Sequence, residues 1–183
     1  MIRRSTWIIL VIFILLLLTV LFWQRGQQNQ QEQITPTPAT SYLFDLAGKS
    51  ITGIAISDPQ GKTVSAIKSS DGTWTLEEPA GEPADSERID SIVGITSGLQ
   101  VISTLFKVGD METLGLNPAS YQIDINLNDG TRLHAFVGGL TPTQSGYNVF
   151  IEGQPLKIVE RYSLEEVLSI LTNPPILQPT GQP

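Results

Sequence analysis

The longest uninterrupted hydrophobic run of the chain lies near its N-terminal end, between Trp7 and Trp23. Its single polar side chain is Thr19. A helix over this run, rising about 1.5 Å per residue, is roughly 25 Å long, which is close to the ~30 Å hydrocarbon core of a bilayer. The two tryptophans lie where aromatic rings prefer the membrane interfaces. The run therefore predicts a transmembrane anchor over residues 7–23.

Charged and small residues around this run distinguish a permanent anchor from a cleaved signal peptide. The run ends in the bulky sequence Leu-Phe-Trp-Gln-Arg over residues 21–25, and it lacks the paired small residues of a signal-peptidase site. Arg3 and Arg4 precede the run and only Arg25 follows it, a bias that keeps the N-terminus inside. We therefore expect residues 1–6 in the cytoplasm, a single-pass anchor in the cell membrane and an extracytoplasmic remainder.

Polar residues dominate both ends of the remaining chain. Residues 24–41 are rich in Gln, Thr and Pro, so they cannot bury enough apolar surface to offset the entropy of ordering. They predict a flexible tether with an end-to-end distance of roughly 20–25 Å. Residues 173–183 have a similar composition and predict a disordered tail. One compact extracytoplasmic domain is left between them, over residues 42–172.

Alternating apolar and polar residues predict an antiparallel meander at the start of this domain. Its three strands are expected over residues 51–57, 62–70 and 73–78. An Asp-Pro-Gln-Gly sequence at residues 58–61 and the pair Asp71-Gly72 provide the two turns. Because side chains alternate along a strand, Trp74 and Leu76 share one face, and we expect the Trp74 ring in the core.

Two helices are predicted by apolar residues at three- and four-residue spacing. Asp85 or Ser86 caps the first helix, and Ser163 with Glu166 has the spacing of a capping box at the start of the second. The apolar face of the first helix comprises Ile89, Ile92, Val93, Thr96 and Leu99, and that of the second comprises Leu164, Val167, Leu168 and Leu171. Each face predicts a helix that packs on the sheet.

Between the two helices the strand pattern returns five times. The expected strands cover residues 100–108, 121–127, 131–137, 147–153 and 156–160. Asn-Asp-Gly at residues 128–130 joins two of them as a hairpin. Strands followed by a helix thus occur twice, so we predict an α+β domain with this repeated order behind one transmembrane helix. Whether the halves are a true duplication stays open, because they share order rather than sequence.

Charge and composition exclude several classes of partner and chemistry. Of 11 Lys and Arg residues, three flank the predicted anchor, which leaves 8 basic against 18 acidic residues, a net charge of −10, in the exported part. Such a surface opposes the binding of nucleic acid and of anionic lipid headgroups. The chain has no cysteine, which excludes disulfides, thiolate nucleophiles and cysteine-based metal sites.

Two short motifs resemble catalytic sequences but occur in the wrong context. Gly-Lys-Thr at residues 61–63 ends like a phosphate-binding loop, yet Ile56 occupies the position where that motif requires another glycine. Ser65 and Lys68 match the Ser-x-x-Lys spacing of penicillin-binding enzymes, which needs a helix to bring both side chains to one face. On a strand they point to opposite faces. We interpret both motifs as ordinary strand residues.

Metal ligation is equally poorly supported by the sequence. Residues 124–130 place oxygen ligands at alternate positions like a calcium loop, but Asp129 replaces the required glycine and Ala135 replaces the final glutamate. His134 is the single histidine, and one histidine without cysteine argues against a zinc site or a Ser–His pair. We interpret these residues as a half-buried strand and its hairpin.

Neighbouring carboxylates are the remaining candidates for chemistry. The pairs are Glu77 with Glu78, Asp85 with Glu87, and Glu165 with Glu166. Two carboxylates can flank a glycosidic bond, but such neighbours are usually solvated, and nothing here predicts the raised pKa that a catalytic acid needs. We therefore assign no catalytic, cofactor-binding or metal-binding residue and expect no cofactor.

Three groups of residues resemble those of a bacterial family. They are the Gly-x-Trp sequence before a Pro-rich break (Gly72, Trp74, Pro79), the Leu-Gly-Leu-x-Pro turn (Leu114, Gly115, Leu116, Pro118) and the Gly-Tyr pair before the last helix (Gly146, Tyr147). In this order they are similar to the family catalogued as domain of unknown function 4340, over nearly the whole exported domain. The resemblance implies a membrane-anchored envelope protein associated with gliding-type ABC transporter components, and it supplies no catalytic residue.

These observations favour a non-catalytic, membrane-tethered domain that binds or scaffolds a neighbouring protein complex of the cell envelope. The alternative is a cell-wall glycan hydrolase, or a glycan-binding module, that uses surface carboxylates. Two acids that converge in a concave pocket would favour the enzyme. An exposed apolar patch or a free strand edge would favour the binding domain.

Overall fold

The structure is a computed structural model, and it describes residues 40–106 and 109–178. The predicted anchor over residues 7–23, the segment before it and nearly all of the predicted tether lie outside these residues. Within the described ranges, no helix is long and apolar enough to cross a bilayer.

Strands make up most of the regular structure in the described residues. They are β1 (Ser41–Tyr42), β2 (Ile51–Ser57), β3 (Thr63–Lys68), β4 (Trp74–Glu78), β5 (Gln100–Leu105), β6 (Tyr121–Leu127), β7 (Arg132–Leu140), β8 (Gly146–Ile151) and β9 (Leu156–Glu160). The helices are α2 (Ser86–Ser97), α3 (Arg161–Leu168) and the short 3-10 helix η1 (Ser169–Leu171).

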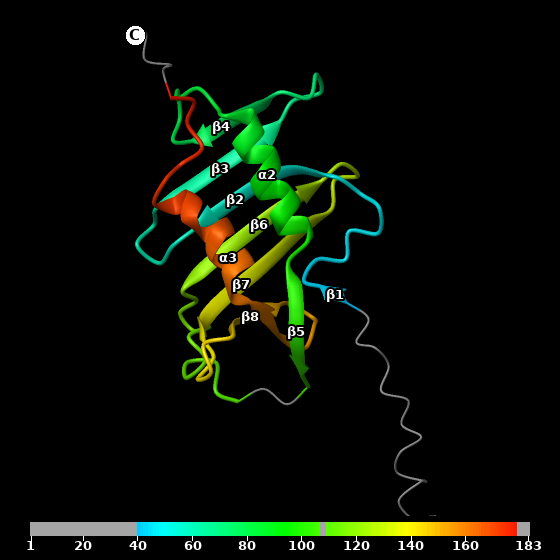
Figure 1. The fold of residues 1–183 in the computed structure, drawn as a ribbon, viewed down its shortest axis with the longest axis vertical. Helices are drawn as coiled ribbons and strands as arrows, with labels where there is room; N and C mark the ends of the chain where they lie inside the picture. The colour runs from blue at the N-terminus through cyan, green and yellow to red at the C-terminus, as the bar shows by residue number, and fades with distance from the viewer. Residues whose placement is uncertain (1–39, 107–108, 179–183) are drawn as a thin grey trace, which may run out of the picture. The chain divides into compact units, whose positions relative to one another are not determined.

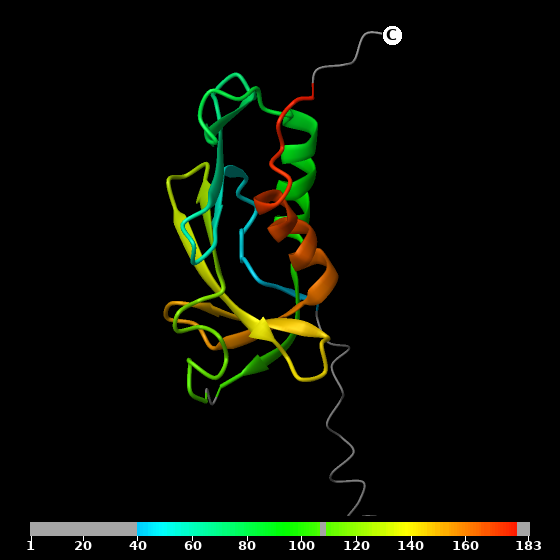
Figure 2. The same ribbon diagram turned by 90° about the vertical axis from the view of Figure 1, so that its left-hand side faces the viewer.

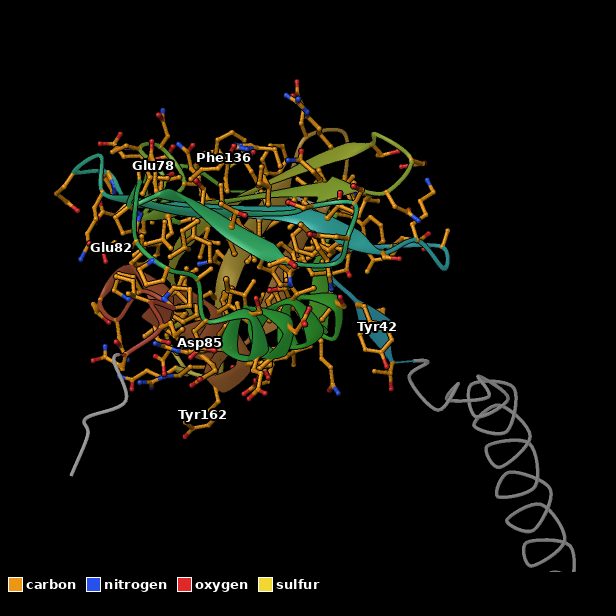
Figure 3. All side chains as sticks on the ribbon, turned by 90° about the horizontal axis from the view of Figure 1, so that it is seen from above. Tyr42, Glu78, Glu82, Asp85, Phe136 and Tyr162 are labelled. Atoms are coloured by element: carbon orange, nitrogen blue, oxygen red, sulfur yellow. The ribbon has the colours of Figure 1, made fainter. Side chains whose placement is uncertain are left out.

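All these strands join one sheet, in the order β1-β5-β9-β8-β7-β6-β2-β3-β4, and every neighbouring pair is antiparallel. Helices α2 and α3 lie side by side on one face of the sheet (Figures 1 and 2). Figure 3 shows Phe136 on the opposite face, whereas Tyr162 of α3 points away from the sheet on the helical side.

Apolar side chains between the sheet and the helices form the core. Ile123 and Ile125 of β6 are fully buried, while Asp124 between them is exposed on the other face. Ile89 of α2 and Leu164 of α3 belong to the same cluster of buried side chains. Each such side chain contributes about 1.5–3 kcal/mol when it is removed from water. The period-two pattern of the strands therefore determines which face of the sheet the helices cover.

The predicted fold class, an α+β domain with strands-then-helix order occurring twice, is wrong. The strands on either side of α2 do not form two units, because β2 pairs directly with β6 along most of its length, and β1 pairs with β5 at the far end of the sheet. The result is a single, mostly antiparallel sheet. Neighbours in sequence are not always neighbours in a sheet, and local periodicity does not encode which distant strands pair.

The predicted N-terminal meander is confirmed. Strands β2, β3 and β4 pair in succession. Gly61 and Gly72 adopt positive φ angles of 84° and 90° in the two turns, a conformation that a residue without Cβ adopts at low cost. Trp74 is buried in the core, with 2% of its surface exposed, as the alternation along β4 predicts.

The two helices differ in how well their starts were predicted. Asp85 caps α2 as expected, because its Oδ1 accepts a hydrogen bond of 3.1 Å from the Arg88 backbone N–H. The predicted capping box of Ser163 and Glu166 is wrong. Glu160 is the cap of α3, and its carboxylate accepts bonds of 2.8 Å from the N–H groups of Tyr162 and Ser163. Glutamate is not a preferred capping residue, so no local pattern predicts Glu160 as the cap.

Two chain segments outside the predicted elements also pack against the domain. Strand β1 pairs with the first two residues of β5. Just after β1, the Leu43 carbonyl accepts a hydrogen bond of 3.0 Å from the Lys157 ammonium. At the other end, the described part of the predicted disordered tail, residues 173–178, lies against the loop before α2. There the Arg88 guanidinium donates to the carbonyls of Asn173 and Pro174 at 2.7 and 3.1 Å.

Candidate functional site

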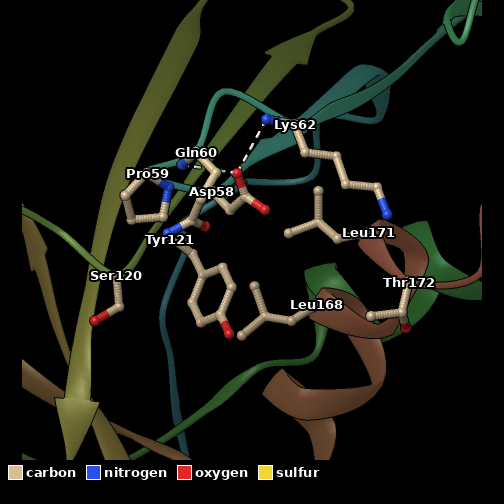
Figure 4. A pocket seen from close by; sticks show the side chains of 9 residues that line it. All are labelled: Asp58, Pro59, Gln60, Lys62, Ser120, Tyr121, Leu168, Leu171 and Thr172. Atoms are coloured by element: carbon tan, nitrogen blue, oxygen red, sulfur yellow. Dashed lines mark hydrogen bonds between the residues drawn. The ribbon is translucent and has the colours of Figure 1, made fainter.

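A hollow of about 370 Å³ lies where the β2–β3 turn, the start of β6 and the end of α3 meet (Figure 4). Its lining residues are Asp58, Pro59, Gln60, Lys62, Ser120, Tyr121, Leu168, Leu171 and Thr172. Such a volume is in the range of small-molecule sites. Leu168 and Leu171 are buried in the core and form its apolar part.

The single carboxylate of this hollow is already occupied by its own turn. Asp58 Oδ1 accepts hydrogen bonds from the backbone N–H groups of Gln60 and Lys62, at 3.0 and 2.9 Å. Thr172 donates its hydroxyl to the Ser169 carbonyl at 2.9 Å. Glycosidic hydrolysis needs two carboxyl groups in defined roles, so this hollow has no set of groups for that reaction.

The carboxylate pairs proposed from sequence do not converge. Glu77 and Glu78 lie on the edge strand β4, and Asp85 is the cap of α2. Glu165 receives hydrogen bonds from the Tyr147 hydroxyl at 3.2 Å and from the Arg161 guanidinium at 2.8 Å. Burial and this carboxylate raise the pKa of Tyr147. These acids therefore have structural roles. They lie on an edge strand, cap α2 or accept hydrogen bonds beside the start of α3.

The sheet face opposite the helices carries an interaction that the sequence analysis did not identify. His134 and Asp124 are direct cross-strand partners, and His134 Nδ1 is paired with Asp124 Oδ1. Phe136 packs against the His134 ring edge-on, with centroids 4.3 Å apart. The signal was available, because a hairpin turn centred on Asp129 places residues 124 and 134 opposite each other.

The pair formed by His134 and Asp124 has few neighbouring groups that could take part in catalysis or bind a metal ion with it. In the described part of the chain, no group of three or more His, Cys, Asp or Glu residues is close enough to hold a metal ion. Asp129, at the hairpin tip, is paired with Lys49 at 2.8 Å, and this bond holds the pKa of the Asp129 carboxyl far below its usual range. We interpret both acids as stabilising their hairpin.

The Ser-x-x-Lys motif contributes to packing through its lysine. Lys68 Nζ lies 3.0 Å from Asp90 Oδ1 and 5.2 Å from the centre of the Trp74 ring. The Trp74 indole N–H donates to the same oxygen at 2.7 Å. These two bonds, with the Trp74 bond the stronger influence, lower the pKa of Asp90. Ser65 takes no part in this cluster, and the two motif residues do not meet.

The two edges of the sheet differ in their protection against strand addition. The edge strand β4 carries the exposed acids Glu77 and Glu78, and charged side chains normally protect an edge. At the other edge, β1 covers only Gln100 and Val101 of β5. The rest of β5, from residue 102 onward, has no charged side chain up to Phe106.

Large apolar side chains are exposed along this second edge. We call them the β5 strip: Tyr42, Ile102, Leu105 and Phe106, which are 49%, 51%, 37% and 84% exposed. Scattered single apolar residues are normal on a surface, but several exposed apolar side chains along one edge of a sheet are typical of an interaction site. The sequence analysis expected a strand here and did not predict that its side chains would be exposed.

Comparison with protein families gives a match. The family described as "Domain of unknown function (DUF4340)" matches residues 39–119. The resemblance is thereby confirmed over residues 39–119, and the match does not extend to Gly146 and Tyr147. Comparison with curated proteins and with solved structures gives no match.

The structure explains part of the sequence pattern that carries the resemblance. In the Leu-Gly-Leu-x-Pro turn, the Leu114 carbonyl accepts a hydrogen bond of 2.8 Å from the Gly139 N–H of β7. A Cβ on Gly138 would lie 2.3 Å from that carbonyl oxygen, and a Cβ on Gly115 would lie 2.7 Å from the Gly139 nitrogen. The glycines therefore allow the turn and β7 to approach backbone to backbone.

Proposed function

We propose that this chain is a membrane-tethered, extracytoplasmic binding domain without catalytic activity, which joins a protein complex of the cell envelope. The observation that carries the proposal is the β5 strip. Its side chains Ile102 and Phe106 are exposed at a sheet edge that lacks charged residues. Burial of such side chains against a partner is favourable, at about 25 cal/mol for each Å² of apolar surface removed from water.

The distribution of charge supports an apolar contact with a protein. The exported part of the chain is strongly acidic, so most of its surface repels other acidic surfaces. The β5 strip is an uncharged part of that surface, and aromatic residues such as Tyr42 and Phe106 are typical anchors of protein interfaces. A protein partner with a matching apolar groove therefore fits this edge better than nucleic acid or anionic lipid does.

The membrane tether and the identity of the partner rest on the sequence. The apolar run over residues 7–23 supports a single-pass anchor with the domain outside the cell membrane. The family resemblance supports an ABC transporter component as the partner, in which case the domain is an accessory of that transporter. Among residues 40–106 and 109–178, no observation supports the alternative of a glycan hydrolase or glycan-binding module. The candidate carboxylates there lie on separate elements or are already hydrogen-bonded.

A photo-crosslinking amino acid placed at residue 106 of the full-length chain, in intact cells, tests this proposal. The matched control is residue 162, because Tyr162 is also an exposed aromatic side chain, 76% accessible, but lies on α3. We expect one dominant protein adduct from residue 106 that residue 162 does not give. Identical adduct patterns from the two positions would contradict the proposal, and crosslinks to glycan would favour the alternative.

A further inference from the structure

Residues 173–177, which we call the strap, run from the end of η1 to the loop before α2 (Figures 1 and 2). Ile176 of the strap lies opposite Ala84 in a short antiparallel bridge. Two backbone hydrogen bonds of 2.9 and 2.8 Å close this bridge, from the Asp85 N–H to the Pro175 carbonyl and from the Leu177 N–H to the Pro83 carbonyl. The domain therefore binds the strap in the manner of an added strand.

Arg88 of α2 also binds the strap through its backbone. The guanidinium donates to the carbonyls of Asn173 and Pro174, at 2.7 and 3.1 Å. Within the described ranges, no carboxylate forms an ion pair with this guanidinium. Carbonyl oxygens are present in every peptide segment. Arg88 and the bridge therefore recognise the backbone of the strap and leave most of its side chains unselected.

Two side chains of the strap contact the core. Pro175 is buried and Ile176 is partly buried, whereas Asn173 is exposed and Leu177 is 55% exposed. Pro174 and Pro175 have no N–H, but both contribute their carbonyls to the bonds above, so neither loses a bond here. The surface under the strap, which we call the strap site, therefore selects two adjacent apolar residues.

Pro175 does not fill the space beneath it. A small cavity lies between this ring and apolar side chains of β2, β3, α2 and η1. Atoms that line such a void lack dispersion contacts on one side. A larger apolar side chain in place of Pro175 would restore these contacts, so a segment with leucine at this position fits the strap site better than the strap does.

We propose that the strap site is a second interaction site of the domain. It binds an extended segment of a partner protein that carries proline followed by two apolar residues, and the strap is its autoinhibitory occupant. Only Thr172 separates the strap from η1, which ends at the buried residue Leu171, and one residue spans at most ~3.6 Å. The strap of a second copy therefore reaches this site only if η1 unpacks, which favours a separate partner.

The short connection also determines how strongly the strap competes. A segment joined by a short linker has an effective concentration on the order of mM at its site. A partner segment must therefore bind more tightly than the strap, or bind after the strap is displaced. None of the residues of the strap site belongs to the β5 strip, so this inference and the proposed function can fail independently.

Disulfide locking of the strap in the full-length chain tests the inference, because the chain has no native cysteine. Ala84→Cys and Ile176→Cys change directly opposite positions of the bridge, where Cβ atoms are about 4.5–5.5 Å apart, near the spacing that a disulfide needs. Oxidation locks the strap in place and reduction frees it. The probe is a fluorescent peptide with the sequence of residues 173–178 that carries Pro175→Leu.

Fluorescence anisotropy of this peptide compares the two states of one protein. We expect at least ~10-fold tighter binding to the reduced form, because the locked strap excludes the peptide. Equal affinity in the two states would overturn the inference. A cysteine pair that does not oxidise would also overturn it, because residue 176 would then not be held against residue 84.

A second substitution in the reduced form tests the role of Arg88. Arg88→Gln should weaken peptide binding, whereas Arg132→Gln, which changes an exposed arginine on β7, should leave it unchanged. Thermal unfolding shows that each variant is folded. Binding that is insensitive to Arg88→Gln would overturn the strap site. A reduced form that sediments as a dimer without peptide would identify a second copy as the occupant and overturn the assignment to a partner protein.

Discussion

The indole Nε1 of Trp74 donates a hydrogen bond of 2.7 Å to Oδ1 of Asp90, and this contact joins the edge strand β4 to helix α2. Lys68 of β3 contacts the same carboxylate oxygen at 3.0 Å. Asp90 of α2 therefore connects this helix to the buried ring of Trp74 in β4 and to Lys68 in β3. The contact gives Trp74 a structural role in the core.

Replacement of Trp74 by alanine should strongly destabilise the domain. A buried tryptophan truncated to alanine costs about 3–5 kcal/mol in lost burial and cavity formation. Trp74→Phe keeps an aromatic ring but loses the bond to Asp90, so its cost should be smaller. Chemical denaturation of the full-length chain in detergent measures both. A Trp74→Ala variant as stable as the wild type, with binding to isolated cell wall lost, would contradict the structural role.

Acid should weaken the contribution of Asp90 to stability. Hydrogen bonds from Trp74 and then Lys68 lower the pKa of Asp90 in the folded state. The carboxylate therefore stabilises the fold fully above the unfolded-state pKa of about 3.9, and this stabilisation disappears as the pH falls through the lower folded-state pKa. The free energy of unfolding, measured between neutral pH and pH ~2, should decrease more for the wild type than for Asp90→Asn. Parallel pH profiles would argue against this role.

Substitution at two adjacent glycines of β7 should have unequal effects. A Cβ on Gly138 would lie 2.3 Å from the Leu114 carbonyl oxygen, whereas the nearest atom to a Cβ on Gly139 is that oxygen at 3.7 Å. Gly138→Ala should therefore cost about 1–3 kcal/mol of stability through overpacking, and Gly139→Ala should cost much less. Thermal unfolding of the two variants is the comparison. Equal loss at both positions would show that the turn does not pack on β7 in this way.

Removal of divalent metal should leave the stability of the domain unchanged. The two acids of the calcium-like sequence are already engaged, Asp124 with His134 and Asp129 with Lys49. We expect the same melting temperature with and without EDTA. A large decrease in EDTA would mean that residues 124–130 bind a metal ion after all.

Local patterns predicted most individual elements of the domain. The turn glycines and the alternation along β2, β3 and β4 located the meander, and the helical spacing around Ile89 and Leu164 located both helices and their buried faces. These features depend on residues within a few positions of one another. The sequence is therefore informative wherever the structure is decided locally.

Features decided by distant residues were not predicted. The pairing of β2 with β6 joins residues about 70 positions apart, and it converts two expected units into one sheet. Strand β1 is too short for any periodicity, and Glu160 caps α3 although its side chain is an unusual cap. The exposure of Phe106 depends on what covers β5 in three dimensions. The expected strand over residues 100–108 could not show which of its side chains face solvent.

The central claim, that the β5 strip binds a protein partner, is tested most directly by the size of the complex that mild detergent releases from membranes. The comparison uses the wild-type chain, Phe106→Asp and the control Tyr162→Asp, which changes another highly exposed aromatic residue, on α3. We expect the wild type and Tyr162→Asp to sediment as a larger complex, and Phe106→Asp to sediment as the monomer with an unchanged melting temperature. A Phe106→Asp chain that sediments with the wild type would contradict the account.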